Sequence, residues 1–123
     1  MDLAQIRQQV MTGASAVSAK KATDVVVLEV GPLLGITDFF LLLSTANARQ
    51  LKAAVEEAEH QLRTTHGRRP IGREGSPEAG WIVLDYGDFV IHAFTAVQRE
   101  VYGLERLWSD AVRTEVDEAV EAR

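Results

Sequence analysis

The chain contains no cysteine among its 123 residues. A disulfide framework, a thiolate zinc site and a cysteine nucleophile are therefore excluded, and the composition suits a reducing compartment. Long apolar runs are also missing, because none approaches the roughly 20 residues needed to cross a bilayer. The first residues lack a basic segment followed by an apolar one, which is the pattern of an export signal. We therefore expect a cytoplasmic protein with no membrane partner.

Excess positive charge is absent as well. The formal net charge is -5 at pH 7, which argues against broad electrostatic attraction to nucleic acid but leaves room for a basic protein partner. The hydrophobic content of 46% and the charged content of 25% are ordinary for a globular chain. A chain of this length is typical of one domain around one hydrophobic core.

Apolar periodicity predicts the elements of the first half. Apolar residues at three- and four-residue steps predict an amphipathic helix over residues 3–17, with Asp2 as its N-cap. The segments 24–30 and 38–44 are rich in β-branched or apolar residues and predict two buried strands. A second helix is expected from an Asn47 cap to a stop at Gly67.

A hairpin is the main prediction for the second half. Trp81–Asp85 and Asp88–Phe94 flank Tyr86-Gly87, a two-residue connection that predicts a β-turn. This register sets Asp85 opposite Asp88, Leu84 opposite Phe89, Ile82 opposite Ile91 and Trp81 opposite His92. One hairpin face then carries Ile82, Leu84, Phe89 and Ile91 and should pack under helices, whereas the other face is mixed.

The remaining segments complete one layered domain. Residues 67–80 predict a loop with a short edge strand around 70–74, and a last helix is expected after Phe94, with Val97, Val101, Leu104 and Trp108 on one stripe. The order of elements predicts an α/β (α+β) fold over residues 1–109, a mixed β-sheet flanked by helices. Residues 110–123 are acid-rich and predict a mobile tail.

Two aspartates beside the predicted turn are the nearest approach to a catalytic pair. Asp85 and Asp88 could hold a divalent cation or share acid–base work. Asp is also common beside turns because its side chain accepts hydrogen bonds from local backbone N–H groups. The hairpin offers few oxygen ligands for a cation, so a structural or recognition role is favoured over metal catalysis.

Histidines and arginines indicate no catalytic site. No two histidines have the helical spacing of a zinc site. His92 lies in a predicted strand opposite Trp81, where cross-strand packing is favoured over catalysis. Arg68, Arg69 and Arg73 form a basic cluster in a glycine-rich loop, which could contact RNA phosphates or an acidic surface, or simply favour solubility. Because the net charge of the chain is -5, any RNA contact is expected to be secondary.

Aromatic residues favour a binding role. Trp81, Tyr102 and Trp108 are amphipathic residues of the kinds that dominate protein interfaces. Acidic residues accompany them in the sequence: Glu74, Asp85, Asp88, Glu100 and Glu105. Such a surface suits a partner that presents arginine or lysine.

A string of motifs carries a family resemblance over residues 3–109. It comprises Ile36-Thr37-Asp38, Arg49-Gln50, Glu74-Gly75, the run from Trp81 through Asp85-Tyr86-Gly87-Asp88 to His92, then Arg99, Tyr102 and Leu104-Glu105-Arg106-Leu107-Trp108. In these motifs the chain resembles the ribosomal silencing factor family, also called Iojap-like. Ala96-Val97-Gln98 and Ser44-Thr45-Ala46-Asn47 depart from the family pattern, so residues 96–98 are left out of the predicted contacts.

The resemblance implies a translational repressor. Such a protein binds the large ribosomal subunit through ribosomal protein uL14 and sterically blocks association with the small subunit. The family fold resembles nucleotidyltransferases without their catalytic carboxylates, which implies no enzymatic activity, no cofactor and no metal. The alternative is a divergent nucleotidyltransferase that uses Asp85 and Asp88 with Mg²⁺. Homodimers and a role in large-subunit biogenesis are further implications. The predicted partner contacts are Trp81, Asp85, Tyr86, Asp88, Arg99, Tyr102 and, on the loop, Glu74.

Overall fold

A mixed β-sheet runs through the residues that the computed structural model describes, 1–116. Within them it has six strands in the order β3-β4-β5-β2-β1-β6. Their bounds are β1 Thr23–Glu29, β2 Phe39–Thr45, β3 Gly72–Ser76, β4 Trp81–Asp85, β5 Phe89–Thr95 and β6 Val112–Glu115. β2 and β5 pair in parallel, and the other neighbours pair antiparallel. The predicted mixed sheet is confirmed.

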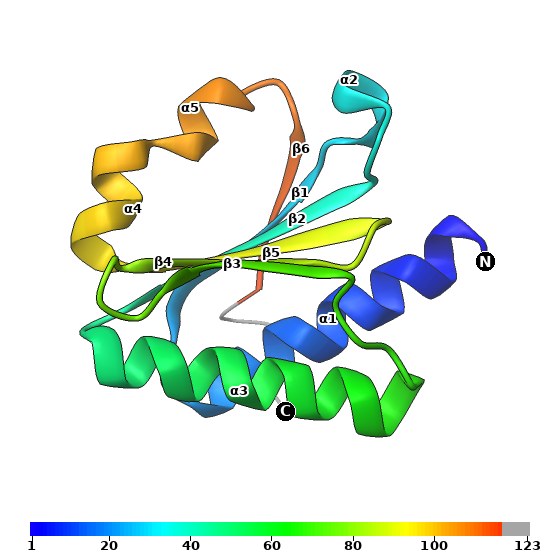
Figure 1. Ribbon diagram of the computed structural model, residues 1–123. Coiled ribbons are helices and arrows are strands. Elements are labelled where there is room, and N and C mark those ends of the chain that lie inside the picture. Colours follow the sequence, from blue (N-terminus) through cyan, green and yellow to red (C-terminus); the bar gives the residue numbers. More distant parts are fainter. Residues whose placement is uncertain (117–123) are drawn as a thin grey trace.

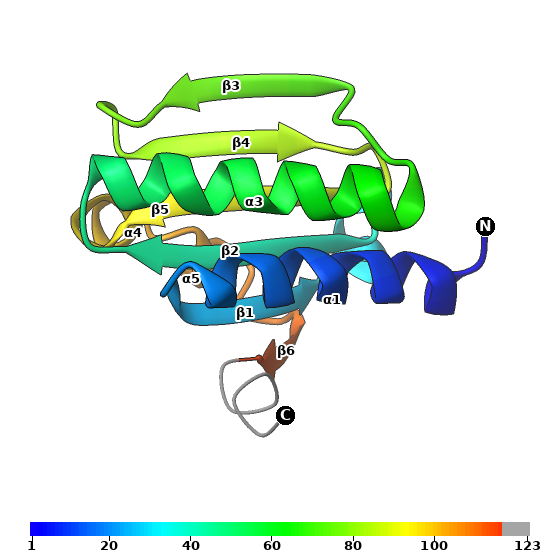
Figure 2. The same ribbon diagram turned by 90° about the horizontal axis from the view of Figure 1, so that it is seen from below.

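Helices cover both faces of this sheet. The long helices α1 (Leu3–Ala19) and α3 (Ala48–His66) lie side by side on one face, as Figures 1 and 2 show from two directions. The short helices α2 (Gly31–Leu34), α4 (Ala96–Tyr102) and α5 (Leu104–Leu107) lie on the opposite face (Figure 1). No helix within residues 1–116 has the length and apolar character to span a membrane.

Local sequence explains where the long helices begin and end. The Asp2 carboxylate accepts a hydrogen bond from the Gln5 backbone N–H at 2.9 Å, and the Asn47 side chain accepts one from the Gln50 N–H at 2.9 Å. Both bonds satisfy donors that a helix N-terminus leaves free. Gly67 ends α3 in the left-handed region at φ 66°, which a glycine adopts without steric cost. The predicted caps at these three residues are confirmed.

The main core lies between the sheet and the long helices. It includes the predicted hairpin face of Ile82, Leu84, Phe89 and Ile91, which is buried with side chains of α1 and α3. A smaller cluster fills the opposite face, where Val26, Leu28, Val30, Phe40 and Leu42 are buried. Because β1 and β2 are covered on both faces, their sequences contain continuous apolar runs.

The hairpin register differs from the prediction by two residues. Trp81 pairs with Phe94 and Asp85 with Val90, and the Tyr86 N–H donates to the Phe89 carbonyl at 2.9 Å. The tight turn is therefore at Gly87-Asp88, where Gly87 has φ +88°, and not at Tyr86-Gly87. Side chains alternate with a period of two along a strand, so a shift of two residues preserves the predicted faces.

Two predictions for the last third are wrong. Gly103 adopts φ 58° and breaks the expected helix into α4 and α5. Residues 112–115, placed in a mobile tail by the sequence, form β6 and pair with β1, and Val116 is fully buried. β6 forms because the open edge of β1 offers backbone hydrogen-bond partners. The sequence around residue 110 does not reveal these distant partners. The rest of the predicted tail, 117–123, lies outside the described residues.

Candidate partner-binding surface

Four aromatic rings meet on the sheet face that carries α4. The Trp81 ring lies 5.1 Å from Phe94 and 4.2 Å from Tyr102, between centroids. The Trp81 indole N–H donates to His92 Nδ1 at 3.3 Å. β4 and β5 supply three of these rings and α4 supplies the fourth, so the cluster joins the helix to the sheet.

Trp81 and Tyr102 form the accessible part of this cluster. Tyr102 is 48% exposed and Trp81 is half-buried, whereas Phe94 is fully buried. Val83 and Asp85 follow Trp81 at two-residue steps on β4 and share its face. The structure places the predicted contacts Trp81, Asp85 and Tyr102 on one accessible amphipathic surface, to which Val83 also belongs.

Glu74 adds an exposed acid to the same face. It pairs with Val83 across β3 and β4, and directly opposed residues in an antiparallel pair project on the same side of a sheet. We name Glu74, Trp81, Val83, Asp85 and Tyr102 the β4–α4 surface. Its aromatic and acidic side chains have the composition predicted for contact with a basic partner.

His92 is a packing residue at the floor of this surface. Its ring lies edge-on to Phe40 at 4.7 Å, and it is 9% exposed. Burial lowers the pKa of His92 to about 4, so the imidazole is neutral at physiological pH. A neutral ring can accept the Trp81 hydrogen bond at Nδ1, in agreement with the predicted packing role.

The two turn aspartates are engaged within the chain. Asp85 Oδ1 accepts a hydrogen bond from the Gly87 N–H at 2.8 Å, which is a local turn contact. The Asp88 carboxylate accepts from both terminal nitrogens of Arg68, at 3.0 and 3.4 Å. No group of three or more His, Asp or Glu side chains within residues 1–116 has metal-binding geometry. These internal hydrogen bonds favour a structural or recognition role for the two aspartates over metal-dependent catalysis.

Tyr86 lies in the core and not at a partner surface. It is 2% exposed, and its ring stacks on Phe89 at 4.7 Å beneath the long helices. The correction follows from the hairpin register: the turn begins after Tyr86, so this residue continues the alternation of Ile82 and Leu84 and points inward. The structure therefore contradicts a direct partner contact by Tyr86.

Arg99 is also buried and is not part of the β4–α4 surface. It is 8% exposed, and its guanidinium donates to the Asp24 carbonyl, to Ser44 Oγ at 3.0 Å and to Glu105 Oε1 at 2.9 Å. All of these groups belong to the chain itself, which contradicts a direct contact by Arg99. The acceptors lie far away in sequence or beyond the Gly103 break, so the sequence around Arg99 does not reveal them.

The predicted basic cluster is divided by ion pairs. Arg68 contacts Asp88, and Arg73 contacts Glu59 on α3 at 2.6 Å. Arg69 is exposed beside them. These pairs neutralise much of the positive charge of the cluster.

Sequence reasoning missed two exposed apolar residues next to Tyr102. Val97 and Val101 are 70% and 67% exposed, whereas their four-residue spacing predicted only that they share one face of a helix. The spacing shows which residues share a helix face, but it does not show whether that face is buried or exposed. These valines enlarge the apolar area beside the β4–α4 surface.

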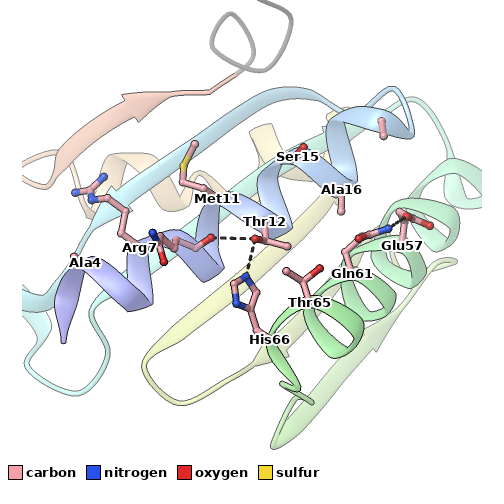
Figure 3. Close-up of a pocket in the computed structure, with 12 residues that line it drawn as sticks. Ala4, Arg7, Met11, Thr12, Ser15, Ala16, Glu57, Gln61, Thr65 and His66 are labelled. Atoms are coloured by element: carbon pink, nitrogen blue, oxygen red, sulfur yellow. Dashed lines mark hydrogen bonds between the residues drawn. The ribbon is translucent and has the colours of Figure 1, made fainter. Parts of the chain in front are cut away.

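A separate open groove of about 890 Å³ lies between α1 and α3 (Figure 3). Thr12 Oγ1 and His66 Nε2 are hydrogen-bonded across it at 2.8 Å. Its walls come from outward-facing residues of both helices, including Arg7, Met11 and Gln61. None of the predicted contact residues lines this groove, which is on the far side of the sheet from the β4–α4 surface.

Fold and surface together define a class: a small α/β protein with a mixed sheet, turn aspartates held in internal contacts and an exposed aromatic surface. The family model for ribosomal silencing factor during starvation matches residues 3–123. The chain belongs to the ribosomal silencing factor family. The match extends through β6, beyond the predicted domain limit at residue 109.

Relatives from bacteria and organelles agree with this assignment. A ribosomal silencing factor of Bacillus subtilis is 33% identical over 104 residues, which cover 85% of this chain and 87% of the relative. One from Halalkalibacterium halodurans is 35% identical over 103 residues, covering 84% and 87%. The chloroplastic Iojap protein of Arabidopsis thaliana is 33% identical over 103 residues and is longer, since these cover 84% of this chain and 42% of that protein.

Solved structures share the fold. A crystal structure of a Chromobacterium violaceum protein superposes with a TM-score of 0.78 at 25% identity, covering 89% of this chain and 88% of that one. A Bacillus halodurans crystal structure superposes with a TM-score of 0.71 at 32% identity, covering 90% and 98%. The predicted α/β fold class is confirmed by this likeness.

Proposed function

We propose that this protein is a translational repressor that binds the large ribosomal subunit through ribosomal protein uL14. The bound protein occupies space that the small subunit needs, so the two subunits do not join. No bond is made or broken in this mechanism. Family membership supports the proposal, and the protein acts in the cytoplasm.

The observation that carries the proposal is the accessible Trp81–Tyr102 pair. The two rings are in contact at an interplanar angle of 47°, and together they present a large area that loses little conformational entropy on binding. Glu74 and Asp85 lie on the same face and complement basic groups of a partner. The β4–α4 surface therefore has an apolar anchor with an acidic border, which suits a basic ribosomal protein.

The proposal also includes an oligomeric state and a second role. A homodimer is expected, as the family resemblance implies. A contribution to large-subunit biogenesis draws support from a mouse relative named mitochondrial assembly of ribosomal large subunit protein 1, which is 31% identical over 97 residues. These residues cover 42% of that protein, so the likeness concerns the domain shared with this chain.

A subunit-joining assay tests the proposed mechanism. Purified large and small subunits are mixed with excess protein and separated on sucrose gradients. The joined-ribosome peak should fall, and the protein should sediment with the large subunit. A Lys52→Ala variant, changed at an exposed position on α3, should act like the parent. An undiminished joined peak with the parent protein would refute the proposal.

A further inference from the structure

We infer that Arg99 is a positioning residue that holds the α4–α5 segment, and with it Tyr102, in place beside Trp81. Only the expected effect on binding to the large subunit rests on the proposed function. The structural part concerns the chain alone. Arg99 contributes through Tyr102, since its own guanidinium is turned away from any partner.

The helix α4 is attached to the sheet by the Tyr102 ring and by Arg99, and Leu104 and Trp108 pack the residues after it against the smaller core cluster. Its seven residues, Ala96–Tyr102, are too few for a helix that is stable by itself. Thr95 makes no side-chain capping bond, and Arg99 is the buried residue of the helix. Val97 and Val101 point toward solvent and bury no apolar face. The usual attachment of a helix through an apolar stripe is thus replaced by a buried charge.

The guanidinium joins separate parts of the fold. It donates to the Asp24 carbonyl at the irregular start of β1, where Asp24 has φ 50°, and to Ser44 Oγ at the end of β2. Its Nε donates to Glu105 on α5, and Glu105 in turn contacts Arg113 on β6. Because a guanidinium is planar with fixed donors, these contacts fix both the place and the rotation of α4.

The rotation of α4 decides where Tyr102 lies. Tyr102 is three residues after Arg99, so the two lie on neighbouring turns of one helix. Its ring reaches Trp81 at 4.2 Å between centroids only while α4 keeps its place. Loss of the Arg99 contacts should therefore disperse the aromatic pair without unfolding the sheet, whose core is built by α1 and α3.

Amide hydrogen exchange on the full chain tests the positioning without any partner. In Arg99→Met we expect roughly tenfold faster exchange in residues 96–107 and unchanged exchange in β2 and β5. Arg106→Met is the matched control, because Arg106 is exposed on the same segment and makes only a long hydrogen bond of 3.5 Å to the Glu100 carbonyl, and it should match the parent. Unchanged exchange in Arg99→Met would overturn the inference, as would faster exchange spread over the whole sheet. If Arg99→Met does not fold, Ser44→Ala removes one contact and is judged by the same criteria.

A double-mutant cycle measures the effect on binding to purified large subunits. Arg99→Met should weaken binding roughly tenfold in the parent and add little in a Tyr102→Ala background. Equal weakening in both backgrounds would show that Arg99 does not act through Tyr102 and would overturn the inference. If the parent itself does not bind, the proposed function fails, whereas the exchange experiment still decides the positioning.

Discussion

The rings of Trp81 and Tyr102 lie 4.2 Å apart between centroids, although one belongs to β4 and the other to α4. We expect each ring to be an anchor in the contact with the large subunit. Trp81→Ala and Tyr102→Ala should each weaken binding by roughly 2 kcal/mol, because they remove a large apolar area from the centre of the contact. Co-sedimentation with purified large subunits measures this.

The control for these variants is Lys52→Ala on α3. Thermal unfolding should first show that both alanine variants are folded. Folded variants that bind like the parent would place the contact elsewhere on the molecule.

Arg68 and Asp88 form an ion pair that should contribute to stability and not to binding. Arg68 also donates to the Tyr86 carbonyl at 2.7 Å and to Gln9 at 2.6 Å, and it lies over the Phe89 ring. Removing these charged hydrogen bonds in Arg68→Met should lower the free energy of unfolding by about 2 kcal/mol.

Asp88→Asn should cost about 1 kcal/mol, because the amide still accepts one hydrogen bond. Urea titration measures both changes. Affinity for the large subunit should stay at the parent value. A loss of affinity in a stably folded Asp88→Asn protein would instead support the contact predicted from the sequence.

The buried hydroxyl of Tyr86 has no hydrogen-bond partner within the described part of the chain. Burial raises the pKa of Tyr86 to about 12, so the group stays protonated at physiological pH. Tyr86→Phe removes a desolvated polar group and should raise the free energy of unfolding by up to about 1 kcal/mol. Equilibrium denaturation measures the change, and a clear destabilisation would reveal a partner for the hydroxyl.

His92 should make stability depend on pH. Its pKa is about 4 in the folded chain, below the ordinary value of 6.5, so the unfolded state binds the proton more readily. The stability from neutral His92 is complete above about pH 6.5 and is lost as the pH falls toward 4. Between pH 7 and pH 5 the loss should be about 2 kcal/mol.

A His92→Asn variant isolates this effect. Urea titrations at pH 7 and pH 5 compare it with the parent, since the carboxylates titrate in both proteins. The parent should lose more stability than the variant over this interval. Equal losses would show that His92 does not carry the pH dependence.

The sequence was sufficient for the faces of the hairpin but not for its register. Ile82 and Leu84 were predicted as core and are core, because their alternation is the same in both registers. Tyr86 was misplaced because Tyr86-Gly87 and Gly87-Asp88 are both acceptable two-residue turns. The choice depends on whether the Tyr86 ring is buried on Phe89, which is a contact of the folded chain.

Local chemistry by itself determined the caps at Asp2, Asn47 and Gly67, because each depends on residues within a few positions. Only the tertiary structure determines that Arg99 is buried, because its carbonyl acceptor on Asp24 is 75 positions away. The same holds for β6, which needs the open edge of β1 for its hydrogen bonds. Hydrogen bonds between distant segments leave no periodic trace in the sequence. The proposed binding surface therefore forms only where the fold brings β4 and α4 together, with Trp81 against Tyr102.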